Sequence, residues 1–187
     1  MLSNPRVLFI HHDVRSVLSD VEAFEDAVSL VIPSFDRSIL EQFDSSIDVV
    51  ILDWELETPD ARGVVDAVRH RSPTTRILAL VSDVPADDPI DRGADEYLVV
   101  PVSDSQLRLT VEQLVLVSAY EETMSEYFRL ATERAILENE LEAGVDVGDR
   151  YERVSRDIES CQRRAAELRQ EFSRDGFDRA LRRLLGE

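Results

Sequence analysis

Residues 47–53 read IDVVILD, in which four consecutive branched apolar residues end in Asp53. Val and Ile favour extended backbone, and an apolar run without polar alternation is typical of a strand that is covered on both faces of a parallel sheet. Parallel sheets gather functional groups at the carboxyl ends of their strands, so Asp53 is the first candidate for a functional side chain.

Further apolar runs of the same kind occur on both sides of this stretch, and helical patterns separate them. The runs are VLFI (7–10), VSLVI (28–32), RILALV (76–81) and YLVVPV (97–102). The expected helices are Val14–Phe24, Asp36–Phe43, Ala61–His70, a short one near Ile90 and a longer one that begins at Asp104. Strands that alternate with helices predict an α/β domain with a doubly wound, five-stranded parallel sheet and right-handed crossovers.

The pattern changes to continuously helical after Leu107. The stretch AGVDVGD (143–149) contains two glycines and interrupts this pattern, which predicts a loop between two helices. In the second helix, apolar residues recur at alternating spacings of 3 and 4, as in a heptad seam: Tyr151, Val154, Ile158, Cys161, Ala165, Leu168 and Phe172. We expect an antiparallel α-helical hairpin or coiled coil, followed by a short helix over residues 177–185. Cys161 is expected to pack on the seam.

The composition is strongly acidic. The chain has 187 residues, 39 acidic and 21 basic side chains and a net charge of −18, and every basic residue is Arg. A hydrophobic content of 43% is enough for a core, which argues against a disordered acidic protein. An acidic surface without Lys favours a protein of a high-salt cytoplasm, and an ordinary acidic bacterial protein is the alternative.

The single cysteine excludes an internal disulfide bond and a zinc site built from several cysteines. No apolar run approaches the roughly 20 residues that a membrane span requires, and the N-terminus lacks a signal-peptide pattern. We expect a cytoplasmic protein without membrane contact.

The first half of the chain, residues 1–117, resembles the receiver domain of response regulators in two-component (phosphorelay) systems. Asp53 lies where the family has its phospho-accepting aspartate, and Ser82 lies near the family's Thr/Ser position. RGADEYLVVPV (92–102) is similar to the family's Gly-Ala-x-x-Tyr-x-x-Lys-Pro segment. The resemblance implies a flavodoxin-like sheet and a partner-binding face that includes Tyr97 and Pro101.

The second half, residues 118–187, resembles the HalX domain that follows receivers in haloarchaea. YEETMSEYFRLATERAILENELEA (120–143), YERVSRDIES (151–160) and GFDRALRRLL (176–185) carry this resemblance. It agrees with the acidic, Lys-free composition.

Two departures from the receiver pattern affect the expected chemistry. The family binds Mg²⁺ with two acidic residues at the end of the first strand, where this chain has His11 and His12. The family's Lys, which contacts phosphoryl oxygens, is replaced by Val100. Mg²⁺ prefers oxygen ligands, so the sequence argues against this cofactor, and it implies no other.

Three hypotheses account for the two histidines. They form local hydrogen bonds in a degenerate pocket, or they switch charge against Asp53 when protonated, or they hold a softer metal, with His12 and Asp53 as weak candidate ligands. Asp13 is expected to be the N-cap of the next helix rather than a ligand.

The resemblance implies a response-regulator-like signalling protein, a pseudo-receiver rather than an enzyme, that acts through protein–protein contacts. The expected partners are a sensor kinase or another signalling protein, with a homodimer as a further option. The alternative is a DNA-binding transcriptional regulator, because residues 150–187 hold ten Arg and eight acidic residues. The overall negative charge argues against DNA as a partner.

Overall fold

The computed structural model describes residues 4–19, 21–26, 28–32, 43–57, 60–83 and 88–172. The chain divides into two compact units, Met1–Val115 and Leu116–Glu187. The domain boundary that the sequence suggests, after residue 117, stays a prediction. Apart from Phe43, the helix expected over residues 36–43 lies outside the described residues, and so does the helix expected over residues 177–185.

The first unit is built on one parallel sheet, as the sequence predicts. Its strands are β1 (Arg6–Ile10), β2 (Ser29–Val31), β3 (Val49–Asp53), β4 (Arg76–Val81) and β5 (Glu96–Val99). They lie in the order β2-β1-β3-β4-β5, and every neighbouring pair is parallel. The strand order reverses between β1 and β3, which makes this the flavodoxin-like doubly wound arrangement.

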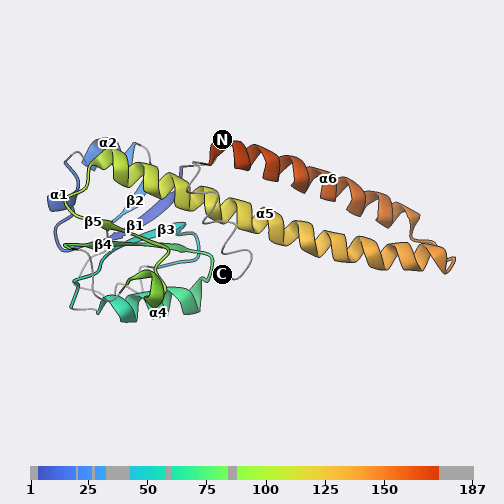
Figure 1. Cartoon of the computed structure of the whole chain (residues 1–187), viewed down its shortest axis with the longest axis horizontal. Coiled ribbons are helices and arrows are strands. Elements are labelled where there is room, and N and C mark those ends of the chain that lie inside the picture. The colour runs from blue at the N-terminus through green and yellow to red at the C-terminus, as the bar shows by residue number, and fades with distance from the viewer. Residues whose placement is uncertain are drawn as a thin grey trace. The chain divides into compact units, whose positions relative to one another are not determined.

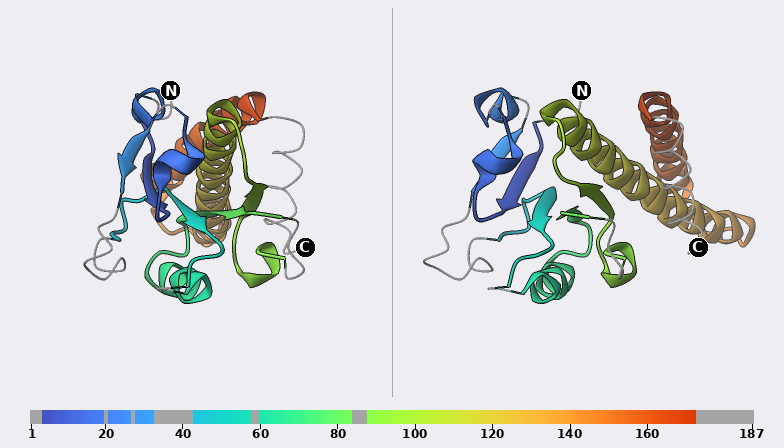
Figure 2. Two further views of the ribbon diagram at one scale, coloured as in Figure 1. Left: turned by 90° about the vertical axis from the view of Figure 1, so that its left-hand side faces the viewer. Right: turned by 60° about the vertical axis from the view of Figure 1, so that its left-hand side comes forward.

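Helices lie on both faces of the sheet (Figures 1 and 2). The strand side chains alternate between these faces and supply two separate cores. On one face, Leu8, Val50 and Ile77 pack with residues of α4 (Ala61–Arg71). On the other face, neighbouring strand residues pack with α1 (Val14–Val17), α2 (Val21–Glu25) and the first part of α5 (Asp104–Glu142). The three central strands are thus covered on both faces, which explains their unbroken apolar sequences.

Two elements of the first unit differ from the prediction. The helix expected over residues 14–24 is two short helices, because Leu18 is extended (φ −95°, ψ 123°) and the Ser19 backbone N–H and hydroxyl donate to the Asp104 carboxylate. This long-range contact cannot be deduced from local periodicity. The last strand ends at Val99 rather than at residue 102, and the following Val100–Pro101 peptide bond is cis.

A buried ionic cluster lies at the amino end of β4. The Asp95 carboxylate is 2.6 Å from Arg69 Nη2 and 3.3 Å from Arg76 Nη1, and it also accepts the Ile77 backbone N–H at 2.5 Å. The Asp95 side chain is only 3% exposed. Arg69 donates further to the carbonyls of Thr75 and Gly93, so this cluster joins α4 to β4 and to the start of β5.

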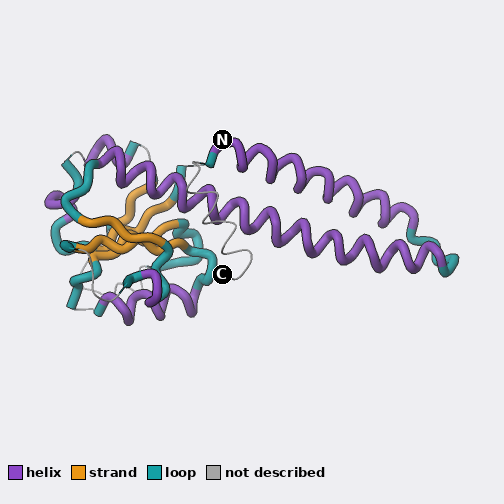
Figure 3. Tube along the Cα trace, viewed as in Figure 1, coloured by secondary structure: helices purple, strands orange, loops and turns teal. Residues whose placement is uncertain are grey.

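The second unit contains the predicted helical hairpin (Figure 3). The later part of α5 packs against α6 (Gly148–Glu171) through two apolar clusters, one around Leu116, Tyr120 and Leu168 and one around Leu137 and Ile158. The predicted seam of α6 provides its side of both clusters. None of the helices that the structure describes has an apolar stretch long enough for a membrane span.

Candidate functional site at the carboxyl ends of β1 and β3

The site follows from the sheet topology. Because the strand order reverses between β1 and β3, the connections leave these strands toward opposite faces and open a crevice at their carboxyl ends. His11 follows directly after β1, and Asp53 is the last residue of β3. Ile10 and Leu52 are register partners, so the residues that follow them lie at the same level of the sheet edge.

The structure brings His11 and Asp53 together. His11 Nε2 lies 3.7 Å from Asp53 Oδ2, and the two side chains are 17% and 19% exposed. This distance is too long for a hydrogen bond, so the contact is an electrostatic approach of a partly buried pair. The His11 ring also meets the edge of the Phe9 ring, with their centroids 6.3 Å apart.

A backbone contact orients the His11 imidazole. Its Nδ1 accepts the Asp13 backbone N–H at 3.0 Å, so the neutral ring carries its proton on Nε2, facing Asp53.

The other Asp53 oxygen and Ser82 are linked through Glu55. Asp53 Oδ1 accepts the Glu55 backbone N–H at 3.0 Å, and the Glu55 carboxylate accepts both the hydroxyl and the backbone N–H of Ser82. Glu55 thus joins the loop after β3 to the end of β4. Sequence reasoning missed Glu55, because a surface glutamate two residues after a strand carries no pattern that separates it from other acidic residues.

Asp13 is the N-cap of α1, as predicted. Its backbone is extended and its Oδ1 accepts the Arg15 backbone N–H at 3.1 Å, which satisfies one of the helix's free donors.

Two of the remaining predicted residues, Val100 and Tyr97, pack into the cores of the sheet and not with the cluster of His11, Asp53, Glu55 and Ser82. His12 is exposed, and so is Pro101. Val100 is partly buried and packs into the core on the α5 face of the sheet, whereas Tyr97 packs against the core on the α4 face. The predicted partner-face residue Tyr97 is therefore partly buried in this structure.

The donor set does not fit Mg²⁺. An octahedral Mg²⁺ needs oxygen ligands, but the side chain that faces Asp53 is an imidazole and the nearby Asp13 carboxylate caps a helix. The Glu55 carboxylate holds Ser82. Among the described residues, no three His, Cys, Asp or Glu side chains form a group suited to a metal ion.

The fold is that of receiver domains. A receiver domain protein from Clostridium thermocellum matches with a TM-score of 0.51 at 20% identity, covering 59% of this chain and 94% of that one. The chemotaxis response regulator CheY4 of Vibrio cholerae matches with a TM-score of 0.51 at 22% identity, covering 60% and 99%. A Francisella response regulator receiver domain gives a TM-score of 0.50 at 22% identity, covering 60% and 97%.

The second unit is identified by sequence. Residues 116–183 match the family model of the HalX domain. The chain therefore has a receiver fold followed by a region that matches the HalX domain. It is also 34% identical over 137 residues to a Haloferax volcanii protein named "Putative transcriptional regulator", covering 69% of this chain. The chain spans only 24% of that relative's length.

Proposed function

We propose that this protein is a signalling component whose receiver domain has a degenerate phosphoacceptor pocket and acts through protein–protein contacts rather than as an enzyme. The observation that carries the proposal is the approach of His11 Nε2 to Asp53 Oδ2 at 3.7 Å. An imidazole stands where phosphoryl transfer to a carboxylate requires a bound cation.

Two further features support this proposal. Val100 packs into the apolar core, so it supplies no charge to stabilise a phosphoryl group on Asp53. Glu55 already occupies the donors of Ser82, which are therefore engaged without any phosphoryl group. The pocket is thus held by contacts within the chain, and we propose that the Tyr97 face binds a sensor kinase or another signalling protein without a phosphorylation signal.

The first test is phosphorylation of the intact protein. We expect incubation with acetyl phosphate and Mg²⁺ in molar KCl to leave the mass of the folded protein unchanged, because no cation bridges Asp53 and the incoming phosphoryl group. Intact-mass spectrometry beside Asp53→Asn provides the measurement. A one-phosphate increase in the wild type that is lost in Asp53→Asn would show that the pocket works, and the protein would then be a phosphorylation switch.

A DNA-binding regulator is the second candidate function. The name of the Haloferax volcanii relative favours it, and α6 presents the exposed pair Arg163 and Arg164. Residues 150–187 have a small excess of Arg over acidic residues. Against it, acidic residues lie on the same helix, and the chain carries a net charge of −18, which repels phosphates at low salt.

We expect the full-length chain to show no salt-dependent retention of duplex DNA when KCl is lowered as far as the protein stays folded. Electrophoretic mobility over a KCl series checks this expectation. If binding occurred, replacing both Arg163 and Arg164 by Gln would have to reduce the slope of log affinity against log salt by about 2, whereas Arg108→Gln would leave it unchanged. That outcome would establish the DNA-binding function instead.

A further inference from the structure

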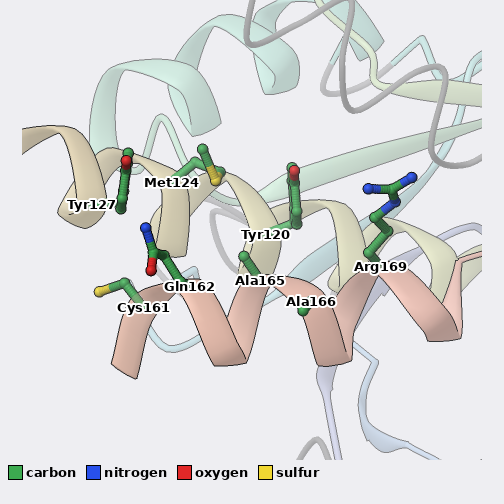
Figure 4. A pocket seen from close by; sticks show the side chains of 8 residues that line it. All are labelled: Tyr120, Met124, Tyr127, Cys161, Gln162, Ala165, Ala166 and Arg169. Atoms are coloured by element: carbon green, nitrogen blue, oxygen red, sulfur yellow. The ribbon is translucent and has the colours of Figure 1, made fainter. Parts of the chain in front are cut away.

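A hollow interrupts the seam of the helical hairpin (Figure 4). It has a volume of about 340 Å³ and lies between the two apolar clusters of the second unit. Tyr120, Met124 and Tyr127 line it from α5, and Cys161, Gln162, Ala165, Ala166 and Arg169 line it from α6. Small side chains on α6 thus stand opposite large ones on α5, and Met124 and Tyr127 stay half-buried between the helices.

This edge of the hairpin is nearly uncharged, although its surroundings are not. Asp, Glu and Arg account for 22 of the 57 residues from 116 to 172. By contrast, Arg169 is the one charged residue among the eight that line the hollow. Of the lining residues, Tyr120 is buried, Met124, Tyr127, Cys161 and Ala165 are half-buried, and Gln162, Ala166 and Arg169 are exposed. A partly exposed apolar hollow on a domain this rich in charge is a candidate contact site.

Another row of side chains on α5 forms ion pairs, both within the helix and with α6. Glu126, Arg129 and Glu133 follow at spacings of 3 and 4 and so share one face, about 150° around the helix from the row of Tyr120, Met124 and Tyr127. Arg150 of α6 reaches Glu133 at 2.6 Å, and Arg129 bonds Glu126 at 2.7 Å. The hydrogen bond from Arg129 lowers the pKa of the Glu126 carboxyl. The Arg150–Glu133 ion pair bridges the two helices from this row, whereas the row along the hollow contacts α6 through apolar clusters, including the ring contact of Tyr120 with Phe172.

The α6 side of the hollow has a charge pattern that suits a second copy of the same helix. Glu159, Gln162, Ala166 and Arg169 follow at spacings of 3, 4 and 3, so they form one row, and all four are exposed. The row is centred on residue 164. In an antiparallel two-fold pairing, Glu159 of each copy faces Arg169 of the other, and Gln162 faces Ala166. A parallel pairing would set like charges against each other.

We propose that this edge is a homodimer interface, in which two HalX domains pack their hollows together about a two-fold axis near residue 164. The proposal is independent of the receiver pocket. The α6 seam is already used inside the hairpin, so self-association requires a surface beside it, and the exposed row from Glu159 to Arg169 provides that surface. Facing copies bury Ala166 and the exposed parts of Met124 and Tyr127 without burying an unpaired charge. The Glu159–Arg169 pairs set the register more than the affinity.

The oligomeric state of the full-length chain tests the interface. Sedimentation equilibrium in molar KCl should give a dimer that dissociates on dilution. Ala166→Glu places a charge in the middle of the edge and should raise the dissociation constant by more than about tenfold, since burying an unpaired charge is costly. Ser160→Glu is the matched control, because Ser160 is exposed on the same helix outside the row, and it should leave the dimer intact.

Charge reversal tests the register. Arg169→Glu or Glu159→Arg alone should weaken the dimer at the lowest KCl that keeps the protein folded, and the two together should restore it. Because Cys161 is the only cysteine and lies near the proposed axis, a short bismaleimide should link two chains, and Cys161→Ser should abolish the link.

Three results would overturn the proposal. One is a monomer at every concentration. A monomer whose Cys161 is protected from maleimide would assign the edge to another molecule or to the chain's own last residues instead. Another is a dimer that Ala166→Glu leaves intact. The third is a dimer that the charge-swapped double variant does not restore, because that result would assign the contact to another surface or register.

Discussion

Asp95→Asn is expected to destabilise the first unit by about 3–5 kcal/mol, because it removes the buried carboxylate charge that Arg69 and Arg76 share. Asn keeps the shape of the side chain, so little of the loss comes from a cavity. The same substitution weakens the bond to the Ile77 backbone N–H, which fixes the beginning of β4.

The single tryptophan makes this measurement specific to the first unit. Trp54 packs against the core on the α4 face, so its fluorescence during denaturant unfolding reports this unit. Glu112→Gln is the matched control, because the Arg108–Glu112 pair on α5 is about half exposed and is worth less than about 0.5 kcal/mol. If Asp95→Asn cost no more than Glu112→Gln, the buried cluster would not be the support that its geometry indicates.

Restoring the oxygen ligands and the cation is expected to give the receiver a phosphorylatable site. In the triple variant His11→Asp, His12→Asp and Val100→Lys, acetyl phosphate and Mg²⁺ should add one phosphate to Asp53, whereas the wild type should stay unmodified. Carboxylates supply the ligands that Mg²⁺ prefers, and a Lys at position 100 can lay its stem along the core and extend its ammonium toward the crevice.

Two readouts separate binding from chemistry in this experiment. Trp54 follows Asp53 directly, so its fluorescence should respond saturably to Mg²⁺ in the triple variant and not in the wild type. Intact mass reports the phosphate, and Asp53→Asn in the triple background is the control. If the triple variant bound Mg²⁺ but accepted no phosphate, a different feature of the pocket would prevent phosphorylation. The Glu55–Ser82 contact would then be the next one to change.

The sheet was predictable because burial on both faces leaves a direct mark in the sequence. The run RILALV corresponds to β4 from its first to its last residue, and all of its residues are buried. The prediction of a single helix over residues 14–24 was wrong for a different reason. The interruption depends on the bonds of Ser19 to Asp104, which lies 85 positions away, and local periodicity contains no information about such a partner.

The site was only partly predictable for the same physical reason. The approach of His11 to Asp53 follows from strand order, because both residues end neighbouring parallel strands. The pairing of Ser82 with Glu55 depends on how a loop side chain folds over the sheet edge, and the sequence cannot specify that. Cys161 lies on the hairpin seam as expected, but the hollow beside it depends on which α5 side chains stand opposite.

The Asp95 cluster and the His11–Asp53 crevice lie at opposite ends of the strands, and this separation has an evolutionary consequence. Substitutions at the crevice leave the ionic anchor untouched, so they should cost little folding free energy even when they abolish a reaction. A domain built in this way can lose phosphoryl-transfer chemistry at the crevice and keep its fold and its partner-binding surface. A few substitutions at the crevice can later restore that chemistry. In this architecture, a few substitutions at the crevice separate a phosphorylation switch from a protein that binds its partners constitutively.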